Sequence, residues 1–131
     1  MSTRVPALLV MHGDLARALL EAAQKVYGPI DDVDVLSNEN LSRESLEDEI
    51  NLRVKSWSEG GLVLTDFWGG SCHICGASVA RKRGEIVVLT GVNLPVLIDY
   101  LHNRDQLGAS ELAERLLKKG QESLRLQRGQ P

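Results

Sequence analysis

Short apolar runs alternate along the chain with longer stretches in which apolar residues recur every three or four positions. Apolar runs that stop at glycine or polar residues predict buried strands at residues 5–11, 33–36, 62–65 and 85–89. Helical spacing of apolar residues predicts helices at residues 15–26, 43–57, 71–81, 95–102 and 110–119. We expect Asp14, Ser42 and Ser71 to act as N-caps of the first three helices.

The order of these elements predicts an α/β fold with a doubly wound, mostly parallel central sheet flanked by helices. The first, third and fourth apolar runs lack polar alternation, which indicates that helices cover both faces of the sheet. Residues 122–127 alternate weakly and predict a last, edge strand. No repeat or linker interrupts the 131 residues, so we expect a single domain over residues 1–131.

Composition narrows the functional class. A net charge of −3 and only five aromatic residues argue against a general nucleic-acid-binding protein. The apolar runs are too short to span a membrane, and the N-terminus lacks the pattern of a secretion signal. Two cysteines are too few for a secreted disulfide scaffold, and together these features predict a cytoplasmic protein.

Polar and glycine residues follow the predicted strands, where ligands bind in a sheet of this kind. His12 ends the first strand, and Asp66 directly follows the third, so we expect the two side by side if these strands are neighbours. The glycines after Asp66 allow the backbone to approach a ligand closely, and the following helix N-terminus favours anions. The candidate phosphoryl-binding residues are Gly13, Gly69, Gly70 and Ser71.

A histidine beside a phosphate site can carry the phosphoryl group itself. A carboxylate that holds one ring nitrogen as N–H leaves the other with a lone pair that points outward. The residues therefore predict His12 as phosphoryl acceptor and Asp66 as the group that orients its ring, and these two are the candidate catalytic residues. The alternative is a strand-end histidine that only packs or caps.

Three motifs in series resemble the mannose-type (mannose/fructose/sorbose) EIIA components of the bacterial phosphoenolpyruvate:sugar phosphotransferase system (PTS). They are Met-His-Gly-Asp-Leu-Ala at residues 11–16, Thr-Asp-Phe-Trp-Gly-Gly-Ser at residues 65–71 and Gly-Val-Asn-Leu-Pro at residues 91–95. One of these motifs alone would be weak, but the three occur in the order and spacing of that family.

The resemblance implies a parallel α/β domain that dimerises by passing its C-terminal strand, residues 122–127, to the sheet of a second copy. It implies that His12 takes a phosphoryl group from the phosphocarrier HPr and passes it to an EIIB protein, in sugar uptake or its regulation. Asp66 matches the assisting aspartate of the family, and Ser71 matches its phosphoryl-binding serine. No metal or diffusible cofactor is implied, and the membrane is reached only through a permease.

The chain departs from the family after the Gly-Gly-Ser sequence. Mannose-type EIIA components commonly continue with Pro, any residue and Asn, whereas this chain has Cys72-His73-Ile74-Cys75. A Cys-x-x-Cys pair at a helix start, where the helix end lowers the thiol pKa, predicts a dithiol redox protein or a redox-regulated phosphocarrier as the alternative function. Two other interpretations remain: a zinc site of Cys72, Cys75, His73 and His12, or cysteines that only pack the helix start.

Overall fold

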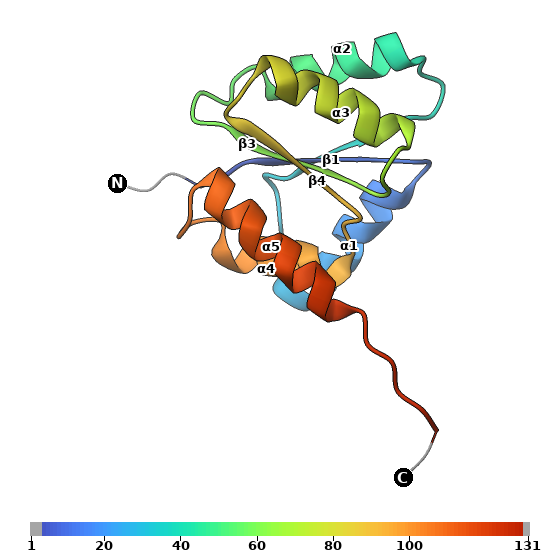
Figure 1. Cartoon of the computed structure of the whole chain (residues 1–131), viewed down its shortest axis with the longest axis vertical. Helices are drawn as coiled ribbons and strands as arrows, with labels where there is room; N and C mark the ends of the chain where they lie inside the picture. The colour runs from blue at the N-terminus through green and yellow to red at the C-terminus, as the bar shows by residue number, and fades with distance from the viewer. Residues whose placement is uncertain (1–3, 130–131) are drawn as a thin grey trace.

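Four strands and five helices make up the part of the chain that the computed structural model describes, residues 4–129 (Figure 1). The strands are β1 (Ala7–Met11), β2 (Asp34–Ser37), β3 (Gly61–Thr65) and β4 (Ile86–Thr90). The helices are α1 (Leu15–Tyr27), α2 (Arg43–Val54), α3 (Ser71–Lys82), α4 (Leu94–Asn103) and α5 (Ala109–Ser123). The predicted strands and helices are therefore all present, with ends that shift by a few residues, except for the predicted last strand.

The four strands form one parallel sheet in the order β2-β1-β3-β4. The chain moves from β1 to β2 on one side and then returns to β3 on the other side of β1. The strand order therefore reverses between β1 and β3, which is where ligands bind in such sheets. The register pairs Val10 with Thr65, so the residues that follow β1 and β3 emerge next to each other.

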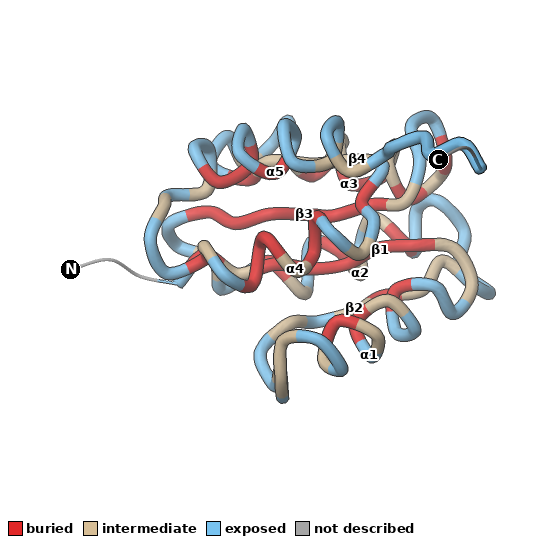
Figure 2. The backbone as a smooth tube through the Cα atoms, turned by 90° about the horizontal axis from the view of Figure 1, so that it is seen from below, coloured by how far each residue is buried: buried red, intermediate tan, exposed pale blue. Residues whose placement is uncertain are grey.

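Helices cover both faces of the sheet, as the apolar runs predict. Figure 1 places α2 and α3 on one face and α1, α4 and α5 on the other. Side chains of β1 alternate between these layers: Leu8 and Val10 pack with α2 and α3, and Leu9 and Met11 pack on the opposite side. All five residues of β1 and of β3 are buried, which is why these strands are continuous apolar runs (Figure 2).

The helix N-termini differ in how they are capped. Ser42 confirms its prediction, because its hydroxyl accepts a hydrogen bond of 3.0 Å from Ser45 N. Asp14 stands at the N-cap of α1, but its carboxylate binds Arg17 and caps no backbone N–H group. The prediction for Ser71 is wrong: Gly70 is the N-cap of α3, and Ser71 is its first helical residue. The helix starts early because Gly70 O already accepts from Ile74 N.

The prediction of an edge strand at residues 122–127 is wrong for the single chain. Helix α5 continues to Ser123, and residues 124–129 form no strand with the described part of the sheet. Figure 1 shows this segment extending away from the rest of the fold, and Leu124 and Leu126 on it are 90% and 79% exposed. Strand β4 therefore remains the sheet edge, and it is only half-buried rather than covered as its sequence predicts.

None of the helices described is long and apolar enough to cross a membrane.

The core that holds β3 in place can be tested at Leu64, which is fully buried two residues before Asp66. We expect Leu64→Ala to lower the free energy of unfolding by about 2–5 kcal/mol, because the cavity forfeits both burial and packing. Leu52→Ala, at a residue that is 65% exposed on α2, is the matched control, and it changes the value by less than about 0.5 kcal/mol. Urea denaturation measures both, and similar losses would contradict this assignment of the core.

Candidate active site

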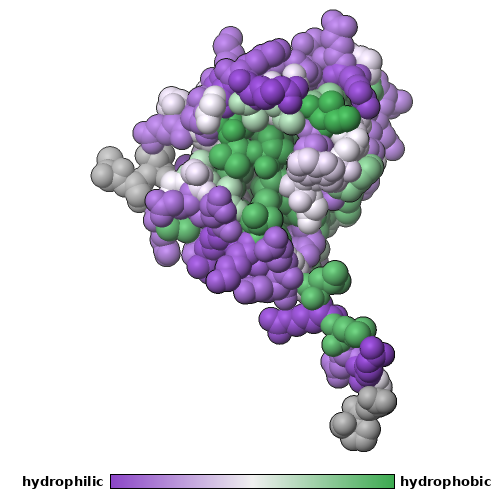
Figure 3. Space-filling model, in the orientation of Figure 1, coloured by the Kyte–Doolittle hydropathy of each residue, from purple (hydrophilic) through white to green (hydrophobic). Residues whose placement is uncertain are grey.

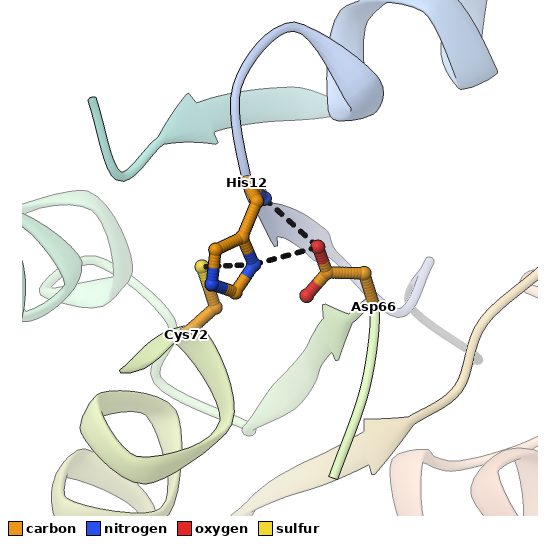
Figure 4. A group of neighbouring side chains, drawn as sticks. All are labelled: His12, Asp66 and Cys72. Carbon is orange, nitrogen blue, oxygen red and sulfur yellow. Dashed lines mark hydrogen bonds and ion pairs between the residues drawn. The ribbon is translucent and has the colours of Figure 1, made fainter. Parts of the chain in front are cut away.

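His12 and Asp66 lie together at the point where the strand order reverses, as the sequence predicts. His12 follows β1 and Asp66 follows β3, and the two strands are neighbours. The Asp66 carboxylate makes two contacts through one oxygen, Oδ2. It accepts a hydrogen bond of 2.9 Å from the backbone N–H of His12 and lies 2.8 Å from its ring Nδ1 (Figure 4).

The Asp66 carboxylate is held in its charged form. Its side chain is only 9% exposed, and burial alone would raise its pKa. The hydrogen bonds from the His12 backbone and ring outweigh burial and lower the pKa below its ordinary value. An ionised Oδ2 at 2.8 Å makes Nδ1 the protonated ring nitrogen. The second nitrogen, Nε2, then carries the lone pair, and the His12 side chain is 36% exposed.

The ring of His12 is fixed from a second direction by Phe67. The two rings stack with centroids 4.8 Å apart and an interplanar angle of 29°. Gly70 allows this arrangement, because a Cβ atom there would lie 2.7 Å from Phe67 Cζ and 3.0 Å from His12 Cε1. Gly69 serves a different purpose, since its φ of +89° turns the chain in a conformation that side chains rarely adopt. Neither the stacking nor these separate roles could be predicted from the sequence.

The N–H groups of all three candidate glycines at this edge already have partners, and that of Gly70 donates to Phe67 O at 3.4 Å. Gly13 N donates to Asn38 Oδ1 at 3.1 Å, and Gly69 N donates to the ring of His73 at 3.0 Å. Asn38 is a member of the site that was not predicted, although an amide side chain directly after the second strand was a usable signal. The start of α3, at Ser71, instead offers N–H groups that have no acceptor within the helix. The predicted phosphoryl-binding residues thus gather at one edge, but their N–H groups are not equally free.

The two cysteines are buried in the helix start and do not form a low-pKa dithiol. Burial, with the negative charge of Asp66, raises the pKa of Cys72 to about 12. Burial also raises the pKa of Cys75, whose thiol lies 3.4 Å from Arg43 O. The expectation of a lowered thiol pKa is wrong here, because burial and the charge of Asp66 outweigh the hydrogen bond with Ser71, which acts to lower the pKa of Cys72. The redox alternative therefore has no support in the structure.

The four residues of the predicted zinc site do not converge. The His73 ring accepts the N–H of Gly69 and stacks on Trp68 with centroids 4.1 Å apart, and Cys75 faces the carbonyl of Arg43. Cys72 alone of the two thiols lies by His12, with Sγ 3.8 Å from Nδ1 (Figure 4).

Together, these features define a parallel α/β domain with a carboxylate-held histidine at the switch point of its sheet. The chain belongs to the EIIA-man family, described as "PTS system fructose IIA component", whose profile matches residues 7–117. Members of this family are components of a sugar phosphotransferase system, so the general reaction is phosphoryl transfer.

Known relatives agree with this assignment. The chain is 28% identical over 115 residues to the sorbose-specific EIIA component of Lacticaseibacillus casei, which covers 85% of this chain and 82% of that protein. It is 29% identical over 126 residues to the mannose-specific EIIAB component of Escherichia coli (strain K12), covering 92% of this chain and 38% of that longer protein.

Solved structures match the fold over nearly the whole chain. The mannose/sorbose-specific IIA subunit from Enterococcus faecalis superposes with a TM-score of 0.85 at 20% identity, covering 98% of both chains. The EIIA component from Streptococcus agalactiae gives the same TM-score and identity, covering 92% of this chain and 95% of that one. At this level of identity, the matches confirm the predicted fold and nothing finer.

The role of Gly70 can be tested with a matched pair of glycines. Gly70 and Gly108 are both N-caps with nearly the same backbone angles (φ −73°, ψ 167° and φ −73°, ψ 169°), but only Gly70 lacks room for a Cβ atom. We expect Gly70→Ala to displace the His12 ring and change its NMR ring resonances, while Gly108→Ala leaves them in place. Unchanged resonances in both variants would show that Phe67 moves aside without disturbing His12.

Proposed function

We propose that this protein is a phosphocarrier that accepts a phosphoryl group from phospho-HPr on His12 Nε2 and passes it to an EIIB protein. The observation that carries this proposal is the hydrogen bond between Asp66 and His12 Nδ1, because it leaves the lone pair on Nε2 of a side chain that is 36% exposed. Membership in the EIIA-man family supports the same reaction. A cytoplasmic protein would serve either sugar uptake or its regulation in this way.

The proposed phosphoryl transfer from HPr to His12 needs no cofactor, because one P–N bond forms as another breaks. The Nε2 lone pair attacks the phosphorus in line, a new P–N bond forms on His12, and the P–N bond to the donor histidine breaks. The ring keeps its proton on Nδ1 and becomes positively charged as the bond forms. Asp66, which is already ionised, stabilises that charge at 2.8 Å. Transfer to EIIB is the same step in the opposite direction.

The phosphoryl oxygens are proposed to bind at the start of α3. Gly70 lies against the His12 ring, and the next residues present the hydroxyl of Ser71 and the N–H groups of the first helical turn. The N–H groups of Gly13 and Gly69 would join them only by exchanging their bonds to Asn38 and His73. No metal ion is required to neutralise the group, since the helix N-terminus supplies partial positive charge.

Two exposed aromatic residues beside His12 fit a surface for the protein partners. Trp68 is 80% exposed and Phe67 is 53% exposed, and both belong to the loop that carries Asp66. Large exposed aromatic side chains are enriched at the centres of protein interfaces. We infer that HPr and EIIB dock over this loop, which brings their own histidines to the exposed side of the His12 ring.

We also propose a homodimer in which residues 124–129 pair with the β4 edge of a second copy. Strand β4 has a free edge, and Figure 3 shows apolar surface between α3 and α5, where β4 lies in Figure 1. A groove beside it is lined by Leu89, Val92, Val96 and Leu116. The exposed Leu124 and Leu126 would fill apolar surface on the partner and complete its sheet.

Phosphorylation of His12 is tested by measuring the intact-protein mass after incubation with phosphoenolpyruvate, enzyme I and HPr. We expect one acid-labile phosphoryl group on the wild type and none on His12→Ala. Asp66→Asn keeps the shape but loses the charge that holds Nδ1–H, so it should slow phosphorylation by about 100-fold. Asp14→Asn, at a carboxylate 71% exposed on the same edge, is the control with unchanged rate. A wild-type rate in Asp66→Asn would remove Asp66 from the mechanism.

The dimer is tested by light scattering coupled to gel filtration. We expect the wild type at twice the chain mass, and Leu124→Asp with Leu126→Asp at the mass of one chain, because two buried carboxylates would be unpaired in the partner's groove. Leu52→Asp is the control: it makes the same replacement of an exposed leucine by aspartate, but on α2, and this variant should remain dimeric. A monomeric wild type would refute this arrangement.

A further inference from the structure

The geometry points to a Zn²⁺ site formed by His12 Nδ1, an Asp66 carboxylate oxygen and Cys72 Sγ. These three ligand atoms lie within 4.8 Å of one another and come from three different parts of the chain, namely the end of β1, the end of β3 and the start of α3 (Figure 4). The site differs from the zinc site that the Cys-x-x-Cys spacing predicts, because Asp66 takes part and His73 and Cys75 do not.

The spacing of the three atoms suits a tetrahedral ion. With Zn–N and Zn–O near 2.0–2.1 Å and Zn–S near 2.3 Å, ligand atoms stand about 3.3–3.6 Å apart. Nδ1 lies 2.8 Å from Asp66 Oδ2 and 3.8 Å from Cys72 Sγ, each within about 0.6 Å of these separations. The ligand atoms all lie within 4.8 Å of one another, so the carboxylate and the thiol need to approach by at most about 1.3 Å. His12 is 36% exposed, which leaves a fourth position for water.

The donor set selects the metal. A thiolate, an imidazole and a carboxylate together favour Zn²⁺ over Mg²⁺ or Ca²⁺, which prefer oxygen ligands alone. One thiolate and one carboxylate neutralise the charge of the ion, so a half-buried site carries no net charge. The thiol has to release its proton to bind, which limits affinity compared with sites built from several cysteines.

Binding of Zn²⁺ and binding of a phosphoryl group then exclude each other, because they require the single ring proton of His12 on different nitrogens. Bound Zn²⁺ takes the lone pair of Nδ1, and the ring proton must move to Nε2. A ring with Nε2–H has no lone pair there, so it cannot accept a phosphoryl group. This consequence rests on the proposed function, whereas the metal site itself does not. Zinc would thus inhibit phosphoryl transfer to His12 and would not act as a cofactor.

Metal binding is tested directly, without any phosphoryl transfer. Co²⁺ added to the wild type should give the thiolate-to-metal charge-transfer absorption of a tetrahedral site, and Zn²⁺ should abolish it by displacement. Cys72→Ser should lose the absorption and weaken Zn²⁺ binding by roughly 10- to 100-fold. Cys75→Ser is the matched control and should behave as the wild type, because Cys75 faces Arg43. An absent absorption, or an equal one in Cys72→Ser, would overturn the site.

Inhibition is tested with purified phospho-HPr, so that no metal-dependent enzyme is present. At a free Zn²⁺ concentration about ten times its Kd, roughly one molecule in ten is metal-free, and phosphorylation of the wild type should slow by about tenfold. The slowing by Zn²⁺, taken within each protein, should be at most about twofold for Cys72→Ser, because its roughly 10- to 100-fold weaker binding leaves about half or more of the molecules metal-free. Binding without inhibition would overturn the exclusion of phosphoryl by metal. A wild type that takes no phosphoryl group without Zn²⁺ would instead refute the proposed function and leave the metal site standing.

Discussion

The candidate site depends on one interaction, the contact of a single Asp66 oxygen with both the backbone N–H and the ring of His12. Its geometry follows from the parallel pairing of β1 with β3, which brings the residues after the two strands to the same edge. A carboxylate that is only 9% exposed would be costly without these donors. The strand pairing and the hydrogen bonds therefore support each other, and neither the ring position nor the charge of Asp66 is independent of the fold.

Burial affects two acidic groups at this site, but their pKa values shift in opposite directions. Asp66 and Cys72 both lose hydration, which raises the pKa of each group. Only Asp66 has N–H donors close enough to reverse the effect, and its negative charge then raises the pKa of the thiol further. The site thus holds an ionised carboxylate beside a neutral thiol. This division of charge explains why the histidine, and not the Cys-x-x-Cys pair, has the electronic environment of a reactive group.

The features that depend on the order of strands, helices and motifs along the chain could be predicted from the sequence. The buried runs and the candidate residues at the strand ends follow from the sequence, which predicts that His12 and Asp66 meet if the first and third strands are neighbours. The strand order β2-β1-β3-β4 meets that condition. Features that depend on which side chains pack around the site could not be predicted, including the burial that raises the pKa of Cys72. The predicted strand at residues 122–127 is absent from the single chain for a related reason: helix α5 takes residues 122 and 123, and residues 124–127 have no neighbouring strand within the described part of the chain.

The chemistry of His12 is decided by which nitrogen carries its one proton. An ionised Asp66 beside Nδ1 keeps the proton there and leaves Nε2 as a nucleophile. Any group that binds the lone pair of Nδ1 moves the proton to Nε2, even if that group never contacts Nε2 itself. Cys72 is the nearest such group, at 3.8 Å, and as a neutral thiol it competes weakly. The same raised pKa that argues against redox chemistry at Cys72 therefore favours the tautomer of His12 that the proposed phosphoryl transfer needs.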